Sequence, residues 1–171
     1  MIWLGFGLAT VALACQCVWE VQAPFFAYGP WIALVLLKRE RAQALWLCAL
    51  AGGVVDLLSD HPMGLHAVNY VVTAAVLARF AKHFLADAPL HLGLYTGVVS
   101  FVSTWLHLFL LFLFDRRVPF AGKWALGEFL GMPILDGVYA LVWFAVPLAL
   151  VTKIKRYWTL FWLKRKNLSP R

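Results

Sequence analysis

The sequence has little charge. Only 13% of its 171 residues are Asp, Glu, Lys or Arg, about half the share found in an average soluble protein. Because 63% of the residues are hydrophobic, too few polar side chains remain to cover a water-facing surface. This shortage excludes an ordinary soluble domain and predicts one integral membrane domain whose surface contacts lipid.

Acidic residues are the scarcer of the charged types, and the formal net charge is +7. Such a balance can indicate nucleic-acid binding, but most of the basic residues here stand in short clusters between apolar runs. That layout orients membrane proteins. We therefore expect membrane lipid as a partner and no nucleic acid.

Cysteine is also scarce. Cys15, Cys17 and Cys48 lie within apolar runs, and their odd number and spacing fit neither a disulfide framework nor a metal site. No nucleophile-elbow or zinc-protease motif occurs, and Asp56 with Asp60 lacks the second acidic motif of metal-dependent membrane transferases. We expect no metal, no cofactor and no catalysis.

Six apolar runs remain, which predict an all-α polytopic bundle of six transmembrane helices. The second run is the weakest, because Pro24 and Pro30 interrupt it, and a re-entrant segment is the alternative. Residues 1–152 would form the bundle and residues 153–171 a basic, aromatic tail. The six runs cover residues 2–19, 21–37, 42–58, 64–80, 90–114 and 128–151.

The basic residues predict the orientation of this bundle. With the N-terminus in the cytoplasm, twelve of the fifteen Lys and Arg residues fall on the inner side. The outer segments hold Arg116, Arg117 and Lys123. Basic loops stay in the cytoplasm, so both termini are expected there.

The tail from Lys153 to Lys166 combines basic residues with aromatic ones. The aromatic residues that recur at helical spacing are Tyr157, Trp158, Phe161 and Trp162. This pattern fits a helix in the inner headgroup region, near anionic lipid. A frayed extension of the last spanning helix fits equally well.

Polar residues within the apolar runs fall in the outer half of the predicted bundle. Ionisable groups inside a membrane are costly and often functional. This asymmetry predicts a polar core or a shallow cavity open to the extracytoplasmic side. A structural polar network and a ligand or partner site both remain open. The residues are Asp56, His66, Asn69, His107, Glu128 and Asp136.

Small residues also recur at helical spacing. Gly93 and Gly97 share one helix face with Ser100 and Thr104, and Gly127 with Gly131 forms a second pair. Small residues let helices approach closely in lipid. Packing within the bundle is one interpretation, and docking of a partner's helix is the other.

The segment from Gly52 to Tyr70 resembles the rod shape-determining protein MreD family. The resemblance rests on a glycine-containing helix, an Asp-Leu-hydrophobic-Ser turn, and a second apolar helix that follows directly. Pro30-Trp31 and the last run, with Pro133, Asp136-Gly137, Trp143 and Pro147, resemble the family more loosely. The residues that carry the resemblance are Gly53, Asp56, Ser59, Pro62 and Gly64.

Each residue of this turn has a physical interpretation. Gly52 and Gly53 would allow close helix packing. Asp56 and Ser59 would satisfy donors at a helix end, while Pro62 would stop the first helix and Gly64 open the second. We therefore expect a tight hairpin on the outer side.

The resemblance implies a non-catalytic scaffold of the bacterial cell-elongation machinery in the cell inner membrane. Proteins of this family bind MreC, a single-span protein, and through it connect with the actin-like MreB and with peptidoglycan synthases. Their fold is similar to the substrate-binding subunits of energy-coupling-factor vitamin transporters. A transporter subunit of that kind is the alternative function.

Overall fold

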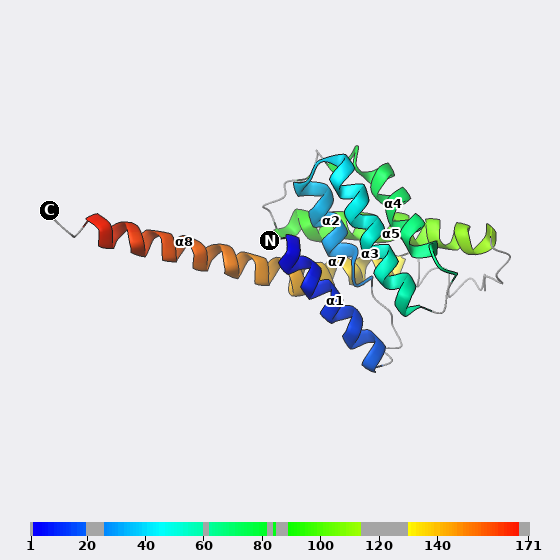
Figure 1. Cartoon of the computed structure of the whole chain (residues 1–171), viewed down its shortest axis with the longest axis horizontal. Helices are drawn as coiled ribbons and strands as arrows, with labels where there is room; N and C mark the ends of the chain where they lie inside the picture. The colour runs from blue at the N-terminus through cyan, green and yellow to red at the C-terminus, as the bar shows by residue number, and fades with distance from the viewer. Residues whose placement is uncertain are drawn as a thin grey trace.

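The structure is a computed structural model that describes residues 2–19, 26–59, 62–81, 84, 89–113 and 130–167. Every regular element in these ranges is a helix, so the predicted all-helical class is confirmed there (Figure 1). The elements are α1 (Ile2–Trp19), α2 (Gly29–Lys38), α3 (Arg41–Leu58), α4 (Leu65–Leu77), α5 (Pro89–Leu113), α7 (Met132–Tyr139), the π-helix η3 (Ala140–Ala145) and α8 (Val146–Asn167).

Three helical stretches are long and apolar enough to cross a membrane: Arg41–Leu58, Leu90–Leu113 and Met132–Phe161. At most 28% of the most apolar window in each is buried inside the protein, so most of this apolar surface points outward. Large side chains such as Trp46 and Phe109 are more than half exposed. Hydrocarbon is the solvent that such a surface requires, as the composition predicts.

The second predicted run forms a short central helix. α2 has 10 residues and is about 15 Å long, half of the roughly 30 Å of a bilayer's hydrocarbon core. The predicted run 21–37 is therefore corrected in its described part, and residues 21–25 lie outside the described ranges. α2 contacts α1, α3, α4, α5, α7 and η3, and its residues Gly29–Leu36 are all buried. The helix begins late because of Pro30, since proline suits the first turn of a helix rather than its middle.

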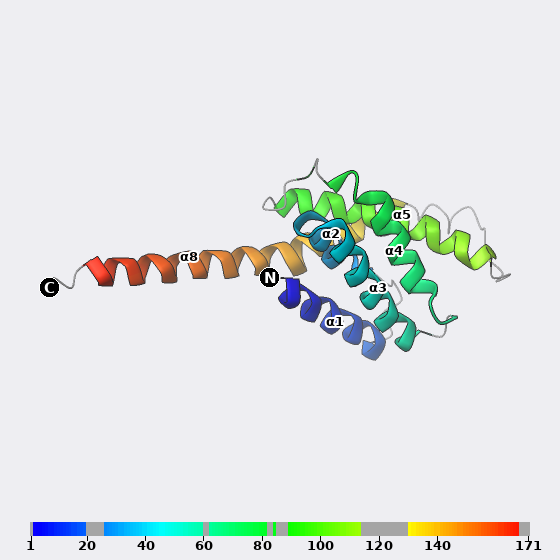
Figure 2. The same cartoon turned by 45° about the horizontal axis from the view of Figure 1, so that its top comes forward.

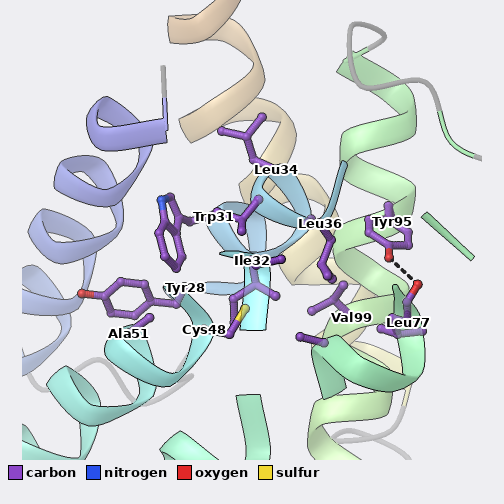
Figure 3. Packing of buried hydrophobic residues seen from close by; sticks show 14 of the residues in the cluster. Tyr28, Trp31, Ile32, Leu34, Leu36, Cys48, Ala51, Leu77, Tyr95 and Val99 are labelled. Carbon is purple, nitrogen blue, oxygen red and sulfur yellow. Dashed lines mark hydrogen bonds between the residues drawn. The ribbon is translucent and has the colours of Figure 1, made fainter. Parts of the chain in front are cut away.

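The hydrophobic core gathers around this helix. Trp31 and Tyr28 are completely buried and extend toward α1 (Figure 3). The indole N–H of Trp31 donates to the carbonyl of Ile2 at 3.0 Å, and the hydroxyls of Thr10 and Tyr28 lie 3.1 Å apart. These bonds attach α1 to the side of the bundle.

The last predicted run, 128–151, begins in the described ranges with α7 and contains a π-helical stretch. η3 ends two residues before Pro147, the second residue of α8. Proline has no backbone N–H and clashes with the carbonyl four residues earlier, and a widened turn accommodates both effects. The helix then continues without a break to Asn167, so the tail extends the same helix away from the bundle (Figures 1 and 2).

Candidate functional site

The hairpin between α3 and α4 is built on one very close backbone contact. A Cβ atom placed on Gly52 would lie 2.4 Å from the Cα of Ala67, closer than any side chain permits. Gly64 has φ of +91°, in the left-handed region that favours glycine. A Cβ on Gly53 would have no described atom within 4 Å. The predicted packing role therefore applies to Gly52 and is wrong for Gly53 within the described ranges.

Asp56, near the end of α3, caps the start of α4. Its carboxylate accepts the backbone N–H groups of Gly64 at 3.1 Å, His66 at 2.9 Å and Ala67 at 3.1 Å. The first N–H groups of a helix have no partner within the helix and carry partial positive charge. A carboxylate on the preceding helix supplies both the acceptors and the charge. The Asp56 side chain is buried, so water does not compete for it.

The other residues of the turn act differently. The carbonyl of Pro62 accepts the N–H of Leu65 at 3.2 Å, which closes the turn into α4. The hydroxyl oxygen of Ser59 is buried and has no hydrogen-bond partner among the residues that the structure describes. Within those residues, the prediction that Ser59 would satisfy a helix-end donor is not met.

His66 connects the hairpin to α5. Its Nδ1 lies 2.9 Å from Oδ1 of Asp56, and the rings of His66 and His107 have centroids 5.2 Å apart. His66 comes from the first turn of α4 and His107 from the later part of α5. Three of the predicted polar residues, from three helices, therefore meet at one place.

One turn further along α4, a second polar contact joins the same two helices. The side-chain amide of Asn69 donates to the Ser103 hydroxyl at 2.9 Å, and the Thr73 hydroxyl donates to the amide oxygen of Asn69 at 3.4 Å. All three side chains are buried. This cluster fixes the rotation of α4 against α5.

Asp136 in α7 forms a third buried polar contact. Its carboxylate accepts the backbone N–H of Phe26 at 2.8 Å and a short hydrogen bond from the Ser100 hydroxyl. The Tyr139 hydroxyl, one turn on, donates to the carbonyl of Ala27 at 3.3 Å. Asp136 is only 2% exposed. It therefore joins α5, α7 and the turn that precedes α2.

On α5 these partners form one stripe. Thr96, Ser100, Ser103 and His107 follow one another at intervals of four, three and four residues, which places them on one helix face. Sequence reasoning identified His107 in this stripe but assigned Ser100 to a packing face and missed Ser103. The helical interval between small polar residues is the signal that identifies both.

A glycine face lies next to this stripe and contacts α7. A Cβ on Gly93 would lie 2.8 Å from Cγ of Leu141, and one on Gly97 would lie 3.1 Å from the carbonyl oxygen of Pro133. Gly137, on the facing helix, meets the carbonyl oxygen of Gly93 at 3.2 Å in the same way. Gly131 has no described atom within 4 Å of such a Cβ.

An apolar groove of about 470 Å³ runs along the outside of this contact, between α5 and α7. The glycines leave it open, and side chains such as Leu94 and Ile134, both more than half exposed, form its walls. Phe101 and Val138 continue the two walls. The groove is therefore bordered by apolar side chains on both helices.

The structure thus brings the predicted polar residues into buried contacts between helices. Asp56, His66 and His107 form one group, Asn69 joins α5 separately, and Asp136 lies apart from both; Glu128 and Gly127 lie outside the described ranges. The carboxylates of Asp56 and Asp136 are both occupied by N–H or O–H donors of the protein itself. In the described ranges, no group of three or more His, Cys, Asp or Glu side chains is placed to hold a metal ion. This geometry favours the structural interpretation of the polar residues.

Comparison with known proteins finds no matching family model, no matching curated protein and no matching solved structure.

Proposed function

We propose that this protein is a non-catalytic, MreD-like scaffold of the bacterial cell-elongation complex, which binds an MreC-like single-span protein and supports peptidoglycan synthesis and cell shape. The α3–α4 hairpin is the observation that carries the proposal. Four of the residues behind the family resemblance lie at or next to this joint, where Asp56 caps α4 and Gly64 adopts a left-handed conformation. A rigid joint at the end of two helices suits a protein that presents a fixed surface to partners.

The proposal includes a place in the cell inner membrane with both termini in the cytoplasm. This orientation requires six passages, and in the second of them α2 supplies helix for only about half of the bilayer's hydrocarbon thickness. Two observations support the orientation. The start of α1 lies beside the point where α8 leaves the bundle (Figures 1 and 2). The exposed basic residue Lys38 ends α2, Arg39 follows it, and Arg79 follows the end of α4, as expected for loops that stay inside.

For the MreC-like partner we propose the groove between α5 and α7 as the docking surface. A membrane-spanning helix buries apolar side chains best against a surface where backbones come close. The close contact of Gly93, Gly97 and Gly137 between α5 and α7 leaves the groove beside it without large side chains, and Leu94 with Ile134 supplies apolar walls. A partner with one spanning helix needs one such groove.

The test is co-purification in mild detergent. The tagged full chain is co-expressed with an MreC-like protein, and retention of that protein is measured for three forms. Ile134→Trp would fill the groove, whereas Val142→Trp places the same bulk at an equally exposed position outside it. We expect retention by the unchanged chain and by Val142→Trp, and a loss of at least about tenfold with Ile134→Trp, the effect of roughly 1.4 kcal/mol.

Two results would contradict this account in different ways. If the unchanged chain never retains the MreC-like protein, the scaffold proposal fails. If both tryptophan variants retain it equally and both fold, the partner binds elsewhere and only the groove assignment fails. Equal elution volumes of the two variants on size exclusion serve as the check for folding.

A vitamin-binding transporter subunit has less support. Such a subunit needs polar groups that a ligand can reach, but Asp136 and Asn69 are each 2% exposed and are bonded to protein groups. A thermal-shift screen with vitamins distinguishes the two functions, since a ligand that binds the folded form raises its apparent stability. A shift that disappears in Asp136→Ala would favour the transporter.

A further inference from the structure

The middle of α8 exposes aromatic and basic side chains outside the bundle. Within α8 we call residues 153–161 the basic aromatic segment. The main contact of α8 with the rest of the protein is made with η3, and the segment lies beyond that contact (Figures 1 and 2). The segment is therefore surrounded by lipid or water rather than by the helices of the bundle.

Length places the segment outside the hydrocarbon. The continuous helix from Met132 to Asn167 is about 54 Å long at 1.5 Å per residue, against roughly 30 Å for the hydrocarbon core of a bilayer. If α7 and η3 lie within the hydrocarbon core together with the bundle, the residues after Thr152 reach the headgroups or the water beyond them. A straight, upright helix would leave Phe161 in water.

The two sides of the segment differ in chemistry. Ile154, Tyr157, Trp158 and Phe161 follow the spacing of one helix face and are 59–73% exposed. Lys153, Arg156 and Thr159 are exposed on the other side, together with the apolar Leu160. One side is thus wholly apolar or aromatic and the other mainly polar, an arrangement that suits a helix lying in a membrane interface.

Charge identifies the lipid. Seven basic residues follow position 152, and no acidic residue occurs after Asp136. A cluster of this kind next to a spanning helix is attracted to anionic headgroups, and tyrosine with tryptophan favours the headgroup level. Neutral lipid would satisfy the aromatic side and leave the basic side without counter-charge.

We propose that the basic aromatic segment lies along the bilayer interface and binds anionic lipid headgroups through Lys153 and Arg156, with Tyr157, Trp158 and Phe161 inserted among the acyl chains. The proposal concerns lipid alone, so it holds whether or not an MreC-like partner is retained. It requires α8 to incline where it leaves the bundle. η3 and Pro147, which interrupt the regular helix there, provide the place for that inclination.

The experiment measures the depth of spin labels on the full chain. Cys15, Cys17 and Cys48 are replaced by alanine, and single cysteines are introduced by Tyr157→Cys, Thr159→Cys and Phe161→Cys. Each labelled protein is placed in nanodiscs of phosphatidylcholine, either alone or mixed with phosphatidylglycerol. Accessibility to oxygen and to a water-soluble nickel chelate is then compared.

With phosphatidylglycerol present, we expect the labels at 157 and 161 to favour oxygen and the label at 159 to favour the nickel chelate. The variant Lys153→Gln with Arg156→Gln should lose this pattern, because each basic residue near an anionic surface contributes about fivefold to binding. Lys38→Gln with Arg39→Gln removes the same charge elsewhere and should preserve it.

Three results would overturn the proposal. Equal access of the nickel chelate to positions 157, 159 and 161 would place the segment in water and make it available to a cytosolic protein instead. An unchanged pattern in pure phosphatidylcholine would show that anionic headgroups are not recognised. An unchanged pattern in Lys153→Gln with Arg156→Gln would assign the binding to other residues. The lipid comparison uses only the labelled chain, so it remains decisive if the charge variant fails to fold.

Discussion

The backbone N–H of Ala67 in α4 donates to the carboxylate of Asp56 in α3 at 3.1 Å, beside the point where the backbone of Gly52 touches the same residue. A polar bond and a close backbone contact thus meet at one residue. We expect substitution of either Gly52 or Asp56 to disturb this joint, because Gly52 has no space for a Cβ and Asp56 accepts three backbone donors.

The capping role of Asp56 predicts a large loss of stability on truncation. Asp56→Ala leaves three N–H groups at the start of α4 without their acceptor, and bonds to a charged group contribute about 1.5–3 kcal/mol each. We expect the free energy of unfolding in detergent to fall by at least about 3 kcal/mol, with Asp56→Asn intermediate. Chemical denaturation followed by circular dichroism measures this. Equal midpoints for Asp56→Ala and the unchanged chain would contradict the cap.

Gly52 and Gly53 offer a matched pair of substitutions. Gly52→Ala places a methyl group 2.4 Å from the Cα of Ala67 and must push α3 and α4 apart, whereas Gly53→Ala points into space without described neighbours. We expect Gly52→Ala to reduce the folded yield severely. Gly53→Ala should be neutral or slightly stabilising, because alanine favours helix over glycine by up to about 1 kcal/mol. The measurement is the thermal midpoint of each variant. A lower midpoint for Gly53→Ala than for Gly52→Ala would refute the contact assigned to Gly52.

The glycine face of α5 predicts a second contrast. Gly93→Ala brings a methyl group within 2.8 Å of Leu141, while Gly131→Ala meets nothing within 4 Å among the described residues. Overpacking of this kind costs about 1–3 kcal/mol. Gly93→Ala should therefore lower the thermal midpoint, with Gly131→Ala as the control. Equal midpoints would mean that α5 does not pack closely against Leu141 of η3 at Gly93.

Ser100 and Asp136 should be energetically coupled. Ser100→Ala and Asp136→Asn each disturb one buried hydrogen bond between α5 and α7. Directly bonded residues show coupling energies of about 0.5–3 kcal/mol in double-mutant cycles. The control cycle pairs Asp136→Asn with Ser103→Ala, whose hydroxyl accepts from Asn69. Additive effects in the first cycle would show that the bond between Ser100 and Asp136 contributes little.

The positions of the helices follow from the sequence to a considerable degree. The apolar runs predicted for residues 2–19, 42–58 and 90–114 end within one residue of α1, α3 and α5, because helix length in lipid is set by bilayer thickness. The short α2 was less predictable. Apolar residues continue on both sides of Pro30 in the sequence. Only the turn at Ala27–Tyr28 in the structure shows where the helix begins.

The partners of the polar residues were beyond sequence reasoning for a different reason. The contact between Asn69 and Ser103 depends on how α4 and α5 are rotated against each other, and one helix pattern carries no information on its neighbour's rotation. The acceptor role of Asp136 toward Phe26 also depends on a turn that lacks helical periodicity. By contrast, the cap by Asp56 was predictable, because the donors lie only 8–11 residues away in a tight turn.

We propose that this chain spans a membrane with its α3–α4 turn outside and its basic loops inside. The most direct test uses spheroplasts, a membrane-impermeant maleimide, and a chain whose three native cysteines are replaced by alanine. Met63→Cys lies in the exposed α3–α4 turn and Lys38→Cys at the exposed end of α2. The account predicts that Met63→Cys reacts in intact spheroplasts and Lys38→Cys only after permeabilisation. Reaction of Lys38→Cys from outside, with Met63→Cys protected, would contradict it.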